Sequence, residues 1–169
     1  MSVPPVRWRI RPRDWAPLGR RLRAVWPRGT GLVVYLEGPL GAGKTSFVRG
    51  LVRAWDRGAD VTSPTFILRE DHEGEGFHFV HVDLYRLRVP AEVEDLALRE
   101  LPVGANLLVE WPERGRGHLP RADLHCVLVP VEGARILEPR GESPQGARVL
   151  DALRADPWLL RRAAGEGAG

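Results

Sequence analysis

The stretch GPLGAGKT, residues 38–45, lies between the apolar run GLVVYLE and the amphipathic segment TSFVRGLVRAW. Its spacing, glycine-x-x-x-x-glycine-lysine-threonine, is the pattern of a loop that binds phosphate groups. Gly41 and Gly43 allow a tight turn that aims successive backbone N–H groups at phosphate oxygens. Lys44 supplies a mobile positive charge for the outer phosphates, and the Thr45 hydroxyl can bind Mg²⁺. The stretch therefore predicts a site for the phosphates of a nucleotide.

Lysine usage supports this interpretation. Lys44 is the only lysine among 25 basic residues, and the others are arginines. A planar guanidinium would fit the loop poorly, whereas an ammonium group acts as a compact point charge. The alternative is a chance match in a chain with 19 glycines. A chance match would not require an apolar strand before the loop and an amphipathic helix after it, and the sequence predicts both.

Two further predicted strands end in a carboxylate. FHFVHVD ends at Asp83, and ANLLVE ends at Glu110. An acid at the carboxyl end of a core strand beside the loop can hold Mg²⁺ or orient an attacking water, although it can also simply cap the next element. The sequence does not rank the two acids. Ser63 and Thr65, in TSPTF, offer hydroxyls in the region where phosphate-loop switches sense the outer phosphate, but Ser-Pro-Thr alone is usually a turn.

The elements that position these residues alternate between strands and helices. Apolar patterning predicts strands at 6–10, 31–37, 65–70, 77–83 and 105–110, and a late hairpin of 122–131 and 134–139. It predicts helices at 14–26 with Asp14 as N-cap, 45–55, 90–101 and 143–163, the last interrupted at Pro157, and a polar turn at 71–76. We therefore expect α/β architecture: a single P-loop NTPase domain with a mainly parallel central sheet, flanking helices and a late β-hairpin.

Composition narrows the function further. The 169 residues are 43% hydrophobic and 28% charged, as in soluble globular proteins, and hold no apolar run of membrane-spanning length and no apolar secretory leader. We therefore expect a cytoplasmic protein that contacts no membrane. Cys126 is the only cysteine, which excludes an internal disulfide, and its apolar neighbours predict a packed core position. No zinc site is expected, because none of the five histidines lies at a metal-ligand spacing from Cys126 in the sequence. These histidines are His72, His78, His81, His118 and His125.

Charge is distributed unevenly. Residues 1–28 hold eight arginines and one acid, Asp14, and so carry +7, whereas the whole chain carries +3. This segment can contact an acidic partner or RNA, or it can be a solvated basic helix in an arginine-rich protein, and net charge alone favours the second interpretation.

Four motifs together resemble the bacterial TsaE family. EGPLGAGKTSFVRGL, VTSPTFIL, HVDLYRL and LLVEWPERGRGHLP follow the family's order and spacing across residues 30–140. The resemblance implies the ATP-hydrolysing subunit of the machinery that makes threonylcarbamoyladenosine (t6A) in tRNA, next to the anticodon. It implies ATP and Mg²⁺ as cofactors, the TsaB–TsaD complex as partner, tRNA contacted through that complex, and no binding to DNA. Pro39 departs from the aspartate that the family often has there.

The resemblance also implies roles for individual residues. The implied catalytic residues are Lys44, Asp83, Glu110 and Trp111, of which Glu110 together with Thr45 would hold the metal. The implied nucleotide-binding residues are Gly41, Ala42, Gly43, Lys44, Thr45 and Ser46, joined by Asp14, Gly133 and Arg135 from more distant segments. The implied switch-like segment is Ser63, Pro64, Thr65 and Phe66.

Within the one domain we expect four segments. These are a basic N-terminal strand and helix at 1–29, the ATPase core at 30–140, a C-terminal helical segment at 141–164, and a flexible tail at 165–169.

Two other functions share the phosphate loop. A small-molecule or nucleoside kinase also needs an acceptor pocket and usually an arginine-bearing lid, for which the short stretch ERGRGHLPR at 113–121 is the one candidate. A GTP-dependent switch needs an Asn-Lys-x-Asp motif to select guanine, and the chain's single lysine already lies in the loop.

Overall fold

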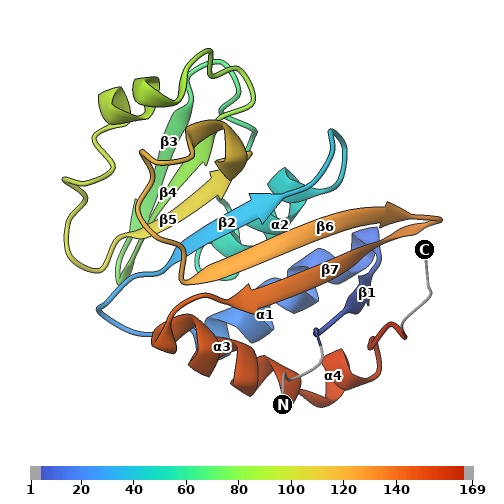
Figure 1. The fold of residues 1–169 in the computed structure, drawn as a ribbon. Helices are drawn as coiled ribbons and strands as arrows, with labels where there is room; N and C mark the ends of the chain where they lie inside the picture. Colours follow the sequence, from blue (N-terminus) through green and yellow to red (C-terminus); the bar gives the residue numbers. More distant parts are fainter. Residues whose placement is uncertain (1–4, 166–169) are drawn as a thin grey trace.

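The computed structural model describes residues 5–165, which contain one sheet of seven strands in the order β1-β7-β6-β2-β5-β4-β3 (Figure 1). The strands are β1 (Trp8–Ile10), β2 (Val33–Glu37), β3 (Arg69–Gly74), β4 (Phe77–Asp83), β5 (Asn106–Glu110), β6 (Leu124–Val131) and β7 (Ala134–Gly141). The α-helices are α1 (Trp15–Val25), α2 (Lys44–Val52), α3 (Pro144–Arg154) and α4 (Pro157–Leu160), and the 3-10 helices are η1 (Pro12–Asp14), η2 (Pro90–Leu96) and η3 (Pro112–Gly115). The architecture is mixed α/β.

The expectation of a mainly parallel sheet was wrong. The parallel pairings are β6–β2, β2–β5 and β5–β4, and the antiparallel ones are β1–β7, β7–β6 and β4–β3. Short connections explain two of the antiparallel pairings, because only two residues separate β3 from β4 and β6 from β7. A link of that length joins antiparallel strands, whereas a parallel pair needs a long crossover. The parallel pairings are thus confined to the centre, where β2 leads into the glycine loop.

The predicted strand at 65–70 and polar turn at 71–76 are displaced along the chain. Residues 65–68 form a turn in which Leu68 has a φ of +64°, and β3 occupies most of the expected turn. β3 lies at the edge of the sheet and pairs with β4 alone in the described chain. An edge strand with both sides near solvent needs no apolar alternation, so its polar sequence, REDHEG, resembles a loop.

The helices follow the predicted pattern with one correction. α1, α2 and the α3–α4 pair lie where helices were expected, and the break before Pro157 is present. The expected helix at 90–101 is instead the 3-10 helix η2, which ends at Ala97 with a φ of +49°. Val93 and Leu98, on either side of that residue, are both buried against the sheet. Tertiary packing of these two side chains therefore overrides the local helical preference.

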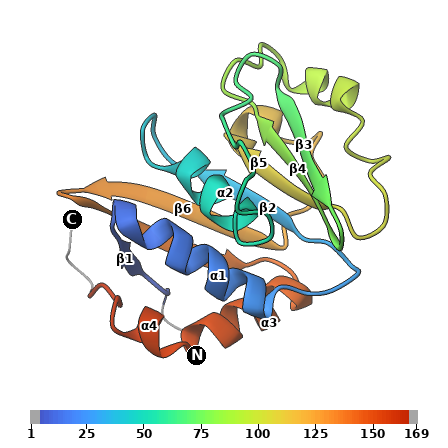
Figure 2. The same ribbon diagram turned by 180° about the vertical axis from the view of Figure 1, so that it is seen from behind.

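Two apolar clusters cover the two faces of the sheet. One contains the buried side chains of α1, α2 and α3, and the other contains those of the segment around η2. Alternation along β5 divides its residues between them, with Leu108 in the first cluster and Leu107 and Val109 in the second. Figure 2 shows α1 and α2 side by side in front of the central strands. Among residues 5–165, every helix is too short or too polar to cross a bilayer.

The two ends of the described chain are tied together. The Asp14 carboxylate lies 2.9 Å from Arg162 Nη2, and the Arg162 guanidinium lies 3.5 Å from the centroid of the Trp158 ring. Asp14 occupies the N-cap position of α1, but its side chain accepts a hydrogen bond from the Arg11 backbone N–H and not from the helix. Burial raises the pKa of Asp14, but hydrogen bonds from Arg162 and Arg11 outweigh it and hold the pKa below its usual value. Asp14 thus links the start of α1 to Arg162 instead of capping the helix as expected.

Of the tail expected at 165–169, residues 166–169 lie outside the described residues.

Helices α1 and α2 cross with their backbones in contact. A Cβ atom placed on Gly19 would lie 1.9 Å from the Gly50 carbonyl oxygen, and one placed on Gly50 would lie 2.5 Å from the Trp15 carbonyl oxygen. Glycine at both positions permits this approach, which brings the start of α1 beside the start of α2. The crossing thereby positions Trp15 near the glycine loop.

Replacing Gly19 with alanine is expected to destabilise the protein by about 1–3 kcal/mol, because overpacking must separate the two helices. At an uncrowded helical position the same change would stabilise by about 0.5–1 kcal/mol, so the sign of the effect is diagnostic. Urea unfolding of Gly19→Ala beside Arg20→Ala, an exposed neighbour on the same helix, measures it. A Gly19→Ala variant as stable as the parent would show that the two backbones are not in contact.

Candidate nucleotide-binding site

The glycine loop connects β2 to α2 at the carboxyl edge of the central strands. Gly38, Gly41 and Gly43 have φ values of +153°, +75° and +99°, which other residues rarely adopt. α2 begins at Lys44, and no side chain caps its first N–H groups. The start of a helix with uncapped N–H groups carries partial positive charge and favours an anion. The loop thus has the backbone geometry of an anion site.

Lys44 is folded back onto the loop. Its Nζ donates to the carbonyl oxygens of Gly38 at 2.6 Å and Pro39 at 2.9 Å, and lies 4.1 Å from the centroid of the Trp111 ring. Burial lowers the pKa of Lys44, and the nearby carboxylates of Glu110 and Asp83 oppose that shift. Because neutral carbonyl groups and an indole face hold the ammonium, a phosphate can recruit it without breaking a hydrogen-bonded ion pair.

Glu110 lies beside the first turn of α2. Its Oε1 accepts a hydrogen bond from Thr45 Oγ1 at 2.8 Å and lies 2.8 Å from His81 Nε2. Only 3% of Glu110 is exposed. Hydroxyl and carboxylate oxygens are the donors that Mg²⁺ prefers, so the chemistry of this pair fits the metal that the sequence predicts.

Asp83 and Glu110 end neighbouring strands and face each other in register. Asp83 Oδ2 accepts hydrogen bonds from Ser63 Oγ at 2.5 Å and Thr65 Oγ1 at 2.8 Å, and its Oδ1 accepts one from the Tyr85 backbone N–H at 2.9 Å. The two acids, which the sequence could not rank, therefore have different partners. Glu110 joins the glycine loop, whereas Asp83 joins the segment that begins at Ser63.

The other residues of that segment are placed differently. Pro64 is buried and its carbonyl oxygen accepts from the Leu68 N–H at 2.6 Å. Phe66 is 82% exposed, and the Arg86 guanidinium lies 4.2 Å from its ring centroid. Hydrogen bonds to Asp83 thus hold Ser63 and Thr65, whereas the ring of Phe66, in the turn that follows, is exposed.

Trp111 follows Glu110 in an unusual backbone conformation. It has a φ of +59°, a left-handed value that is uncommon for a bulky residue. Its ring packs on Tyr85 with centroids 5.0 Å apart, and its backbone N–H donates to the Leu36 carbonyl oxygen at 3.2 Å. This conformation turns the indole over the Lys44 ammonium.

One cavity brings the core candidates together. It has a volume of about 320 Å³. Its lining consists of the loop and first turn of α2 (Leu40, Gly41, Ala42, Gly43, Lys44, Thr45 and Ser46) and of Ser63, Thr65, Asp83, Tyr85, Glu110 and Trp111. Four segments that lie far apart in the sequence therefore converge on one space.

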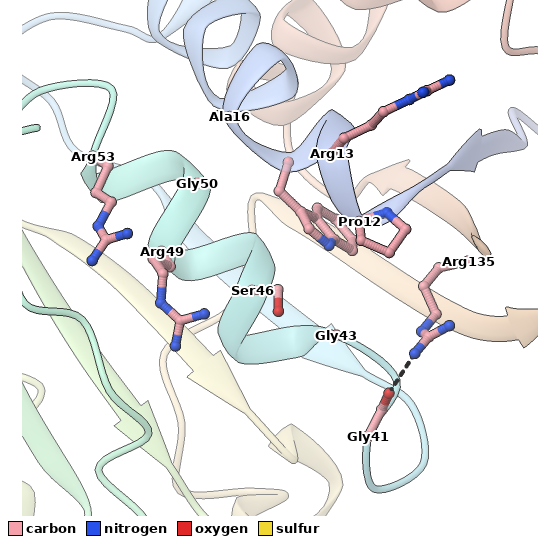
Figure 3. Close-up of a pocket in the computed structure, with 11 residues that line it drawn as sticks. Pro12, Arg13, Ala16, Gly41, Gly43, Ser46, Arg49, Gly50, Arg53 and Arg135 are labelled. Carbon is pink, nitrogen blue, oxygen red and sulfur yellow. Dashed lines mark hydrogen bonds between the residues drawn. The ribbon is translucent and has the colours of Figure 1, made fainter. Parts of the chain in front are cut away.

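A second cavity, of about 460 Å³, lies on the other side of the loop (Figure 3). Its lining is Pro12, Arg13, Trp15, Ala16, Gly41, Gly43, Ser46, Arg49, Gly50, Arg53 and Arg135. Arg135 reaches from β7 to the loop, where its Nε donates to the Ala42 carbonyl oxygen at 2.9 Å and its Nη2 to that of Gly41 at 3.0 Å. Because Gly41, Gly43 and Ser46 line both cavities, the two form adjoining halves of one site.

Two predicted residues lie apart from this site. Asp14 lines neither cavity, because its carboxylate is engaged by Arg162 and Arg11. Gly133 lies in the turn between β6 and β7, where nothing is within 4 Å of an added Cβ. Trp15, which follows Asp14, and Arg135, the third of the predicted residues from the more distant segments, do line the larger cavity.

Sequence reasoning missed several residues that contribute to the site. Arg49 lies on α2 and Arg53 at its C-cap, and their Nε atoms donate to the carbonyl oxygens of Val61 and Ala59, each at 3.0 Å. Figure 3 shows both extending from α2 on the side away from Arg135. His81 was also missed, although its position two residues before Asp83 places both on one face of β4.

Comparisons with known proteins agree with the motifs. The family model described as "Threonylcarbamoyl adenosine biosynthesis protein TsaE" matches residues 11–136. The chain is 36% identical over 123 residues to a tRNA threonylcarbamoyladenosine biosynthesis protein TsaE of Haemophilus influenzae, covering 72% of this chain and 78% of that one. Proteins of the same name from Rickettsia conorii (39% over 130 residues, 74% of each chain) and Streptomyces coelicolor (43% over 99 residues, 57% of this chain and 66% of that one) are also similar.

A solved structure has the same fold. The crystal structure of YdiB from Bacillus subtilis superposes with a TM-score of 0.63, covering 91% of this chain and 97% of that one, at 24% identity. The family model spans the glycine loop, both strand-end acids and the segment around Ser63, and it reaches into β7. This chain therefore belongs to the TsaE family of threonylcarbamoyl adenosine biosynthesis proteins.

Proposed function

We propose that this protein is an Mg²⁺-dependent ATPase that serves the synthesis of threonylcarbamoyladenosine in tRNA. The observation that carries the proposal is the convergence of Lys44, Thr45, Asp83 and Glu110 on one cavity at the start of α2. The names of the relatives support the pathway, because each is a tRNA threonylcarbamoyladenosine biosynthesis protein. Phosphoryl transfer to water needs positioning and charge rather than a covalent nucleophile, and this cavity offers both.

ATP would extend across the two halves of the site. Its triphosphate would lie in the smaller cavity, against the backbone N–H groups of 41–46 and the start of α2. The adenosine would occupy the larger one, where Pro12 and Trp15 provide apolar surface. Arg135 fixes the loop from β7 through its bonds to the carbonyl oxygens of Gly41 and Ala42.

Thr45 and Glu110 would hold the metal. When bound there, Mg²⁺ neutralises charge that develops on the outer phosphates. Thr45 Oγ1 now donates to Glu110 Oε1, so both oxygens already face one point. Lys44 would leave the carbonyl oxygens of Gly38 and Pro39 and move onto the outer phosphates, while Trp111 limits the directions open to it.

Asp83 would orient the attacking water. Its carboxylate already receives the hydroxyls of Ser63 and Thr65. A water or outer phosphate arriving at Asp83 would compete for these hydrogen bonds and release the segment 63–66, which is how a switch segment senses the nucleotide. Phe66, at 82% exposure, would be displaced by that release.

The TsaB–TsaD complex is the proposed partner, and tRNA would be contacted through it. Three large apolar side chains are exposed beside the site: Leu40 and Ile67 at 68% each and Phe66 at 82%. Large exposed apolar side chains that gather at one place favour a protein–protein contact. Because Leu40 also lines the phosphate cavity, a partner seated here would help to enclose the triphosphate.

Asp83→Asn is expected to slow ATP turnover by at least about 10-fold while changing ATP affinity by less than about 3-fold, because it removes the charge that orients water. Asparagine keeps an oxygen for the Tyr85 N–H, and its amide can donate to Ser63 and Thr65. Single-turnover hydrolysis and equilibrium ATP binding measure the two effects. The control is Asp95→Asn, the same change at an exposed position. Loss of ATP binding in the Asp83 variant would assign Asp83 to holding the ligand or the fold.

The proposed function is tested by ATP turnover of the protein alone, then with TsaB–TsaD, then with tRNA added. We expect slow turnover alone and a marked increase with TsaB–TsaD. Turnover that depends on a small-molecule acceptor and does not respond to TsaB–TsaD would instead identify a kinase. Equal affinity for GTP and ATP would favour a GTP-dependent switch.

A further inference from the structure

A cluster of two histidines and a glutamate lies on the β3–β4 hairpin, outside the two cavities. Glu70 and His72 are two residues apart on β3 and so share one face of the strand. His81 lies directly opposite Glu70 in the antiparallel register. One potential ligand atom from each residue lies within 4.8 Å of the others. This cluster could not be recognised from the sequence, because its members come from two strands and none of them is Cys126.

One polar atom of each of these side chains lacks a hydrogen-bond partner. Glu70 Oε2, His72 Nε2 and His81 Nδ1 are buried and have no hydrogen-bond partner in the described chain. His81 is 0% exposed, so its ring has no contact with bulk solvent. Buried polar atoms without partners cost free energy and are uncommon. Three of them on side chains of one cluster indicate a group that satisfies all three at once.

The other ring nitrogen of His81 determines what that group is. His81 Nε2 lies 2.8 Å from Glu110 Oε1. A carboxylate accepts hydrogen bonds, so it favours the tautomer with the proton on Nε2 and leaves a lone pair on Nδ1. A histidine that binds a metal through one nitrogen usually donates the other N–H to a carboxylate, which fixes its tautomer and ring orientation. Glu110 is in that position relative to His81.

We propose that Glu70, His72 and His81 form a Zn²⁺-binding site that links the edge strand β3 to β4. Two imidazole nitrogens and one carboxylate oxygen are a recurrent zinc ligand set, with a fourth position left for water. Glu70 Oε2 and His72 Nε2 are 3.4 Å apart, close to the separation of about 3.3 Å expected between two ligands on a tetrahedral zinc with bonds of 2.0–2.1 Å.

Two further observations agree with a cation. Burial lowers the pKa of His72, although Glu70 opposes the shift. β3 contributes no apolar side chain to either core cluster, and its sequence, REDHEG, is polar throughout. A metal would supply a link to β4 that apolar packing of β3 does not.

The site would also position Glu110. His81 joins the proposed zinc to Glu110 Oε1, and the same oxygen accepts from Thr45 Oγ1. With zinc bound, the His81 Nε2–H would remain directed at Glu110 and would restrict the movement of that carboxylate. Zinc binding does not depend on the proposed ATPase activity, because Glu70, His72 and His81 line neither of the two cavities.

Zinc affinity of the full chain without an affinity tag tests the proposal, by calorimetry and by competition with a chromophoric chelator. We expect one Zn²⁺ per chain. His72→Ala is expected to lower the affinity by at least about 100-fold, and Glu70→Gln by at least about 10-fold, since even outer partners of a zinc ligand contribute 10- to 100-fold. His118→Ala removes a more exposed histidine and is expected to leave the affinity within about 3-fold of the parent.

His72 and Glu70 are the chosen positions because the buried His81 could affect folding, and circular dichroism verifies that each variant is folded. Co²⁺ gives a second readout: strong visible absorption bands of low-coordinate cobalt, without the sulfur charge-transfer band that Cys126 would produce. These bands are expected to disappear in His72→Ala. Failure of Zn²⁺ to bind the parent, or equal affinity of the parent and folded His72→Ala, would overturn the proposal.

Discussion

Lys44→Ala is expected to abolish detectable ATP hydrolysis and to weaken ATP binding. The ammonium is the one mobile charge of the loop, and its side chain is directed toward the phosphate cavity from the first residue of α2. Loss of a preorganised donor to developing charge lowers turnover by about 100-fold or more. Loss of its charge-assisted hydrogen bonds to the ground-state phosphates weakens binding by about 10- to 100-fold. Turnover is thus expected to fall more than affinity.

Lys44→Arg is the matched control for charge. It keeps the positive charge but replaces a point charge by a planar fork, which the narrow space between the loop carbonyl groups and Trp111 does not suit. We expect Lys44→Arg to retain more ATP affinity than Lys44→Ala, with turnover still impaired. Steady-state hydrolysis with and without TsaB–TsaD, and calorimetric ATP binding, give the two quantities. Normal hydrolysis by Lys44→Ala would show that this loop does not bind the phosphates.

Glu110→Ala is expected to remove the benefit of Mg²⁺ and to reduce turnover by about 100-fold or more, because metal-held charge stabilisation is a large part of phosphoryl transfer. Glu110 is the carboxylate that meets the Thr45 hydroxyl, so its loss would leave the proposed metal site without its acidic ligand. ATP affinity of the parent should rise when Mg²⁺ is added, and that of the variant should not.

Two variants separate this effect from a general loss of charge. Glu113→Ala removes an exposed carboxylate that still acts on Lys44 electrostatically, and it is expected to keep the Mg²⁺ response. Glu110→Gln keeps the shape and a hydrogen-bond acceptor for Thr45 and is expected to behave like Glu110→Ala toward Mg²⁺. An unchanged Mg²⁺ dependence in both Glu110 variants would exclude this residue from the metal site.

The centre of the site could be predicted because its signals are local. The loop at 38–45 needs particular residue types at fixed positions, and its glycines, lysine and threonine can be recognised directly in the sequence. Asp83 and Glu110 could be placed near the loop because strands that end in parallel beside it bring their last residues to one edge. Which acid meets Thr45 depends on which strand is the neighbour of β2, and the pattern along a single strand does not contain that information.

Other features of the fold and the site could not be predicted, because they depend on contacts between residues that lie far apart in the sequence. β3 is polar and resembles a turn, since an edge strand needs no apolar face, and its displacement conceals the pairing of Glu70 with His81. Asp14 has the sequence position of a helix cap, but Arg162, 148 residues away, takes its carboxylate. Of the three antiparallel pairings, β6–β7 corresponds to the late hairpin that the sequence predicts, whereas β1–β7 joins strands from opposite ends of the chain and β4–β3 involves the displaced polar strand.

A crystal structure with a non-hydrolysable ATP analogue and Mg²⁺ tests the central claim most directly. The account predicts that the β- and γ-phosphates accept hydrogen bonds from the backbone N–H groups of 41–46, with Lys44 Nζ moved from the Gly38 and Pro39 carbonyl oxygens onto the phosphates. It also predicts that Thr45 and Glu110 hold the metal. Phosphates bound elsewhere, or a Lys44 that stays on the two carbonyl oxygens with the analogue present, would contradict the account.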